Sequence, residues 1–258
     1  MTRLLSYFRK AESSSLHRGM EMRKMGIAFV TLAAVLAGGA QAKSRDPGPP
    51  DQRQVAPGQF DRIAVAGPFL VRVRTGKATS VSLSGPRTML DDTDLFVRDG
   101  QLIIRWQEGA SWSRNGDEGV DIDITLPTLR GVMNAGAGLI DIDHVRGDRF
   151  EATLASAGRV TIDSMDVDQL KAQLAGSGSL RAAGKAGAAD LTLASSGSFD
   201  SPDLITHDAD ITSAGSGFIR TAVTHSANIK AFGSGGIQLT GGAKCSVNGP
   251  ASANVRCS

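Results

Sequence analysis

The strongest constraint on the fold is a glycine that recurs every 18 to 20 residues in the second half of the chain. The residue two positions after each glycine is apolar, and the residue three positions after it is polar. This alternation is typical of a β-strand with one buried face and one exposed face. The recurring glycines are Gly138, Gly158, Gly178, Gly197, Gly217 and Gly235.

A second strand-like run precedes the next glycine in five of these repeats, and only its second and fourth residues are apolar. The runs span residues 151–154, 171–174, 190–193, 208–211 and 226–229. Two such short strands cannot bury an apolar face alone, whereas equivalent strands of stacked repeats can. We therefore predict a parallel β-solenoid of about 20-residue coils, whose glycines permit positive φ and close approach between coils. An antiparallel hairpin array or barrel is the competing fold.

The preceding part of the chain predicts an irregular β region that is continuous with the solenoid. Strand-like runs occupy residues 60–65, 69–75, 80–84, 95–98, 102–106 and 120–127. The pair Asp99 and Gly100 lies between two apolar runs, which is the strongest hairpin signal in the chain. The sequence predicts almost no helix, so the expected fold class is all-β.

Three motifs and the repeated turns resemble a known bacterial family. The motifs are Phe60-x-x-Ile-x-Val65-x-Gly67-Pro-Phe-x-Val71-x-Val73, Val97-Arg-Asp-Gly-x-Leu102-x-Ile104 and Ile124-x-Leu-Pro127. With the Ala-Gly-Ser-Gly turns, they are similar to the GIN-domain family, described as autotransporter-adhesin heads. The resemblance covers about residues 58–258 and implies an exported β-helix-like protein. It supplies no functional residues.

The N-terminal segment has the features of a secretory signal peptide. Residues 26–42 carry no charge, follow Arg23 and Lys24, and end in Ala40-Gln41-Ala42, which fits signal peptidase. We expect cleavage after residue 42, no membrane span in the mature chain, and a periplasmic or cell-surface location. Residues 43–58 contain four prolines and predict a flexible linker before a domain over 59–258.

The charge balance argues against nucleic acid as a partner. Residues 1–42 carry six of the 28 basic residues and two of the 26 acidic ones, so the mature chain has a net charge of −2. Nucleic-acid binding needs a concentrated positive face.

The two cysteines, Cys245 and Cys257, lie near the C-terminus. Because export implies an oxidising compartment, a disulfide is favoured over a metal pair or a catalytic thiol.

The mature sequence carries no familiar catalytic motif. Its histidines, His144, His207 and His225, lie 6, 10 and 8 residues after their glycines, so we expect them not to stack and predict no metal site. Asp143 and Asp163 both lie five residues after their glycines and could form a carboxylate pair or a weak cation site. This pair carries the alternative function, a polysaccharide-active lyase or hydrolase.

We expect other charged residues to fix the register between neighbouring coils rather than to bind a ligand. Arg181, Asp200 and Arg220 occupy equivalent positions, as do Glu151, Lys171 and Asp190, so the sign alternates between neighbouring coils.

Residues 105–119 hold both tryptophans in a polar loop. We expect Trp106 to pack in the core or at its edge. Trp112 either covers an edge of the solenoid or recognises a ligand, with Arg114 and Asn115 as hydrogen-bond donors.

The expected function is that of an exported, non-enzymatic adhesin or cell-envelope binding module without a cofactor. A glycan or another cell-surface component is the expected partner.

Overall fold

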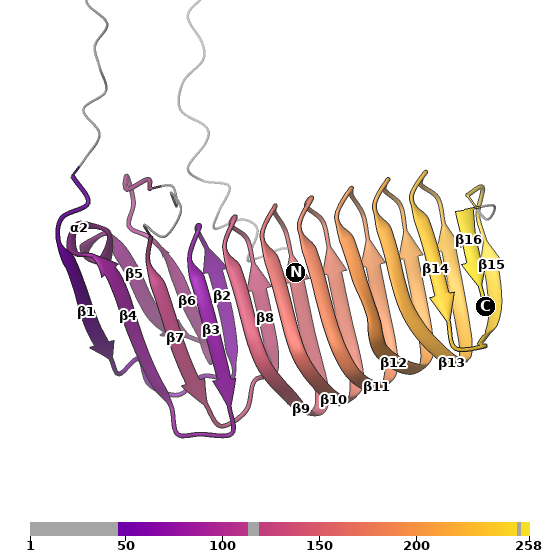
Figure 1. The fold of residues 1–258 in the computed structure, drawn as a ribbon, viewed down its shortest axis with the longest axis horizontal. Coiled ribbons are helices and arrows are strands. Elements are labelled where there is room, and N and C mark those ends of the chain that lie inside the picture. Colours follow the sequence, from indigo (N-terminus) through magenta and orange to yellow (C-terminus); the bar gives the residue numbers. More distant parts are fainter. Residues whose placement is uncertain (1–45, 113–118, 252–253) are drawn as a thin grey trace, which may run out of the picture. The chain divides into compact units, whose positions relative to one another are not determined.

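The structure, a computed structural model, describes residues 46–112, 119–251 and 254–258. It is a parallel β-solenoid of about six turns with irregular strands at its N-terminal part, so the predicted fold class is confirmed. Figure 1 shows each repeat running along one side of the solenoid, bending, and returning along the other side. The predicted signal peptide lies outside the described residues.

Five long strands form the repeats, and each pairs in parallel with the next. They are β9 (Leu139–Leu154), β10 (Arg159–Leu174), β11 (Ser179–Leu193), β12 (Ser198–Ser213) and β13 (Phe218–Ala231). This parallel pairing excludes the antiparallel hairpin array for the repeats. The predicted two strands per coil are one continuous strand, because the ladder of neighbouring coils continues through the bend.

The bend divides the sheet into two faces. The first face contains the first halves of β9–β13 and, in order from its N-terminal edge, β1 (Pro50–Val55), β4 (Ser80–Pro86), β7 (Asp121–Leu126) and β3 (Leu70–Thr75). Strands β14 (Gly236–Thr240) and β16 (Val255–Cys257) complete this face. The second face contains β5 (Thr93–Arg98), β6 (Gln101–Trp106), β2 (Arg62–Ala66), β8 (Gly131–Asn134), the second halves of β9–β13, and β15 (Lys244–Asn248).

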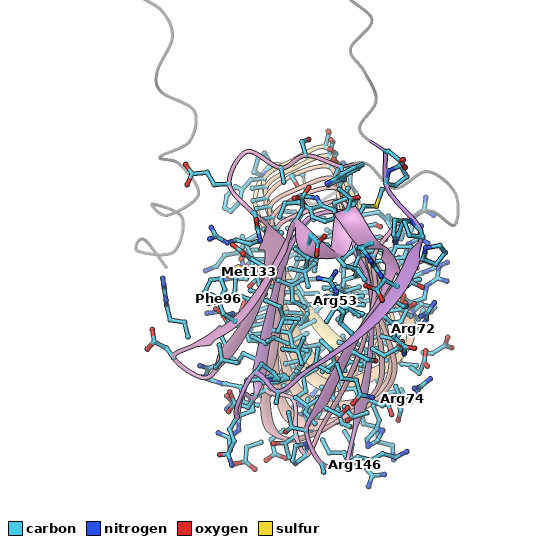
Figure 2. All side chains as sticks on the ribbon, turned by 90° about the vertical axis from the view of Figure 1, so that its left-hand side faces the viewer. Arg53, Arg72, Arg74, Phe96, Met133 and Arg146 are labelled. Atoms are coloured by element: carbon cyan, nitrogen blue, oxygen red, sulfur yellow. A yellow bond between two sulfur atoms is a disulfide. The ribbon has the colours of Figure 1, made fainter. Side chains whose placement is uncertain are left out.

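Apolar side chains from both faces fill the interior. Leu180 pairs with Phe199, which pairs with Ile219, and each is at most 1% exposed. The burial predicted for the apolar residue two positions after each recurring glycine is therefore confirmed in these three coils. Figure 2 looks along the solenoid from its N-terminal end, with Phe96 and Met133 on one side and Arg72 and Arg74 on the other.

The six recurring glycines lie at the corners between coils and are called the corner glycines below. They are required for the close approach of neighbouring coils, whereas the prediction of positive φ at these positions is wrong. None of the six has a φ in the left-handed region. A Cβ built on any of them would instead lie 2.0–2.7 Å from a backbone atom of the preceding turn. The Gly178 nitrogen donates to the Ser156 carbonyl at 2.8 Å, and the Ser198 nitrogen donates to the Gly178 carbonyl at 3.0 Å. Successive turns thus touch through their backbones.

The N-terminal end of the core is closed by a short helix and by part of the expected linker. Strand β1 lies within that linker and pairs with β4 in antiparallel orientation. Helix α2 (Arg87–Asp91) buries Met89 and Leu90 against the core. Arg53 of β1 donates to Asp91 at 2.6 Å and lies across this end in Figure 2. Residues 50–55 are therefore ordered by edge pairing.

The predicted hairpin joins β5 and β6 in antiparallel orientation. Asp99 and Gly100 both have positive φ, 51° and 72°, as a tight hairpin turn requires.

The C-terminal end of the core is closed by the predicted disulfide between Cys245 and Cys257. Cys245 pairs with Ala227 on the second face, and Cys257 pairs with Leu239 on the first face. Because Ala227 and Leu239 point into the core, the disulfide joins the two faces where the next core layer would lie.

Replacing a corner glycine should destabilise the fold through steric overlap. The Cβ of Gly217→Ala would lie 2.0 Å from the Gly197 carbonyl oxygen. We expect a loss of about 2–4 kcal/mol in the free energy of unfolding, measured by urea denaturation. Ser216→Ala, an exposed change in the same turn, is the control and should be neutral. Equal midpoints for the two variants would contradict the close-packed turn.

Breaking the disulfide should destabilise the C-terminal coil. Cys245→Ser/Cys257→Ser should lower the free energy of unfolding by about 3 kcal/mol, because the crosslink restrains the unfolded chain. Urea unfolding with and without reductant measures the effect, and reductant should no longer matter in the double variant. An unchanged midpoint for the wild-type chain on reduction would disprove this role.

Candidate functional site

Trp112 is partly buried rather than free in its loop. Its Nε1 donates to the Asp92 carboxylate at 2.8 Å, and its side chain packs against the hydrophobic core. Trp106 packs on Phe69, with ring centroids 4.5 Å apart, so the predicted packing role of Trp106 is confirmed. Arg114 and Asn115 lie outside the described residues. The geometry supports the packing alternative for Trp112, and its role in recognition stays a prediction.

The predicted charge columns form ion pairs between coils. Asp200 binds Arg181 at 3.0 Å and Arg220 at 2.6 Å. Partial burial acts to raise the pKa of Asp200, but hydrogen bonds from Arg220 and Arg181 outweigh it and hold that pKa below its usual range. Lys171 lies 4.0 Å from Glu151. These charges neutralise one another along the stacking direction.

In the aspartate pair proposed for the alternative enzyme, Asp143 has a structural role. The Asp143 carboxylate accepts hydrogen bonds from the backbone nitrogens of Thr75 at 3.0 Å and His144 at 2.5 Å. It also lies 3.2 Å from the His144 ring nitrogen Nδ1. Asp143 therefore anchors the bend of β9 to the end of β3. Asp163 follows in register on the next coil, between the paired residues Ile162 and Ser164.

The described residues contain one group of histidine and acidic side chains with metal-ligand spacing, formed by His207, Asp208 and His225. Nδ1 of His207 lies 2.8 Å from Asp208 Oδ2, and Nδ1 of His225 lies 2.8 Å from Asp208 Oδ1. The two imidazole rings stack with centroids 4.6 Å apart and an interplanar angle of 23°. The prediction that these histidines would not stack is wrong.

A shortened bend explains the error. Ser201 pairs with Thr221, whereas Ile205 pairs with Ala222, so β12 carries three residues at a point where β13 carries none. A later shift returns one residue, because His207 alone lies opposite two residues of β13. Counting back from the following glycines places both histidines ten residues before Gly217 and Gly235, and this count could have found the pair.

Three side chains form hydrogen bonds with the single carboxylate of Asp208. Hydrogen bonds from Ser226, His225 and His207, in that order of importance, hold the pKa of Asp208 well below its usual range. The Ser226 hydroxyl donates to Asp208 Oδ1 at 2.5 Å. The side chains of both histidines are about 60% exposed, so the rings are open to solvent. This arrangement can present two imidazoles and a carboxylate to a cation.

Two surface hollows of about 290 Å³ each have mostly polar linings. One lies on the first face and includes the Arg181 and Asp200 ion pair. The other lies beside Phe218 and Arg256 near the C-terminal end. No helix in the described part of the chain has the length and hydropathy needed to cross a bilayer.

Comparison with protein families gives one match. Residues 59–243 match the family described as "Putative auto-transporter adhesin, head GIN domain". No curated protein matches the chain.

Solved structures share the fold. A putative adhesin from Bacteroides fragilis has a TM-score of 0.69 and 24% identity, over 78% of this chain and 94% of the other. A putative lipid binding protein from Parabacteroides distasonis has a TM-score of 0.65 and 22% identity, over 82% and 97%. A putative adhesin from Parabacteroides merdae has a TM-score of 0.56 and 16% identity, over 81% and 94%. At these identities the likeness concerns the fold.

Removing the Trp112 indole should destabilise the N-terminal part of the solenoid. We expect Trp112→Ala to cost about 2 kcal/mol, because both core contact and the bond to Asp92 are lost. Trp112→Phe keeps a ring and should cost about 1 kcal/mol, the net value of one hydrogen bond. Urea denaturation of both variants tests this order. An unfolding midpoint for Trp112→Ala equal to that of the wild type would assign the indole to recognition instead.

Proposed function

The chain belongs to the family of putative auto-transporter adhesins with a head GIN domain, and from this premise we propose that it is an exported, non-enzymatic adhesin module of the cell envelope. The observation that carries the proposal is the filled interior. Apolar side chains fill the space between the two faces. A ligand would therefore bind to the outer surfaces or the loops. Extended outer surfaces suit adhesion to large partners.

The regular faces offer little discrimination between partners. Charged side chains on these faces form ion pairs between coils, as Arg181, Asp200 and Arg220 do. Because these charges already neutralise one another, they attract a charged ligand only weakly. Specificity is therefore assigned to the loop that interrupts the repeat between β6 and β7. Loops on a rigid scaffold are common binding elements.

Within this loop, Arg114 and Asn115 are the proposed ligand contacts. Their side chains supply hydrogen-bond donors that suit the hydroxyl and carboxylate groups of a glycan. Trp112 holds the start of the loop against the core through Asp92. This division of roles separates binding from stability.

The test is a binding assay on a glycan panel and on whole cells. The wild-type chain should bind, and Arg114→Ala/Asn115→Ala should weaken that binding by about tenfold, as expected for the loss of contact residues. Arg149→Ala is the control, because Arg149 is exposed on the second face and donates to Gln169. This control should bind like the wild type.

Two outcomes would overturn the proposal. Equal binding by the loop variant and the wild type would remove the loop from recognition. Cleavage of an acidic polysaccharide that is lost in Asp163→Asn would favour the alternative, a polysaccharide-active enzyme.

A further inference from the structure

We propose that His207, Asp208 and His225 form a surface site for a divalent transition-metal ion of the zinc type. Two imidazoles and one carboxylate are a common ligand set for such an ion. The three side chains come from two neighbouring coils, so the site exists only when β12 and β13 are stacked. The site is independent of the proposed adhesion loop.

The donor atoms are close to the spacing that zinc needs. One ligand atom from each residue lies within 4.8 Å of the other two. Ligands of a tetrahedral zinc ion, bound at about 2.0–2.2 Å, are separated by roughly 3.3–3.6 Å. Because each Nδ1 now lies 2.8 Å from an Asp208 oxygen, small side-chain rotations reach this separation.

The backbone beneath the cluster is held in place. Thr206, directly before His207, is fully buried, and its hydroxyl donates to the Ala222 carbonyl at 3.1 Å. The Thr224 hydroxyl, directly before His225, donates to the Thr206 carbonyl at 3.2 Å. These bonds tie together the two segments that carry the histidines. Little backbone reorganisation is needed for binding, which favours affinity.

Both acidic and basic side chains lie around the cluster. Asp190 and Asp210 pair in register two positions beyond Asp208 on the exposed side of the second face. Two lysines also lie near the cluster in register: Lys185 pairs with Ile205, two positions before His207, and Lys244 pairs with Ser226. Ser226 supports the site by donating to Asp208, an outer contact that orients the carboxylate.

Nitrogen ligands and exposure define the ion and its reactivity. Imidazole favours Zn²⁺, Ni²⁺ and Cu²⁺, whereas Ca²⁺ and Mg²⁺ prefer oxygen. Three protein ligands leave at least one coordination position, and the exposed rings place that position towards solvent. A water molecule or a donor atom of another molecule would complete the coordination.

The experiment is a calorimetric titration of the purified full-length chain, without a polyhistidine tag, with Zn²⁺. We expect one ion per chain at this site. His207→Ala and His225→Ala should each weaken its binding by about 100-fold or more, since even supporting contacts change affinity 10–100-fold. Mg²⁺ in excess should leave the titration unchanged.

Two variants serve as controls. His144→Ala removes the other histidine of the described residues that lies beside an aspartate. Asp210→Asn removes a negative charge from the same strand and face. Both should change Zn²⁺ binding by less than about threefold, because charge on an exposed face has a small effect. Circular dichroism of each variant without metal should match the wild type, and His225→Gln replaces His225→Ala if that variant unfolds.

The proposal fails if the wild-type chain binds no Zn²⁺, or if His207→Ala/His225→Ala binds it as tightly as the wild type. It also fails if His144→Ala abolishes binding while the double variant does not. Each result is independent of the glycan assay, so failure of adhesion and failure of metal binding are distinguishable.

Discussion

The whole solenoid depends on backbone contact between successive turns. The carbonyls of four corner glycines accept backbone hydrogen bonds from the next coil, and a Cβ on any of the six would overlap neighbouring backbone. The four are Gly138, Gly158, Gly178 and Gly197. This contact sets a common spacing for both faces. The core columns, the charge pairs and the histidine stack all require that spacing, because each is built from equivalent residues of adjacent coils. A single Cβ at a corner would disturb all of them together.

The difference in length between two neighbouring coils creates the cluster of His207, Asp208 and His225. Most equivalent residues are 19 or 20 positions apart, but the turn from β12 to β13 loses two residues at the bend. The loss brings His225 beside His207 and leaves Asp208 between the two rings. An otherwise repetitive surface thereby gains one position with its own chemistry. The cluster therefore arises from a change in the number of residues per coil, rather than from an unusual residue type.

Sequence alone predicted the features that depend on local alternation. The inward column of Leu180 and Ile219, the hairpin at Asp99 and the Cys245–Cys257 bond follow from period-2 patterning, turn chemistry and cysteine position. It could not predict where residues are skipped in a bend, since a skip changes alignment without changing the pattern on either side. It also missed β1, because the proline-containing segment gains its order from pairing with β4.

The two N-terminal edge strands, β1 and β5, differ in their direction relative to the coil strands. β1 runs in the same direction as the coil strands of the first face, since two antiparallel pairings, through β4, separate it from β7. β5 runs against the coil strands of the second face, because it is antiparallel to β6. A coil offered by another copy could therefore match direction on only one face. This mismatch opposes growth by continued parallel stacking of coils, which open strand edges otherwise invite.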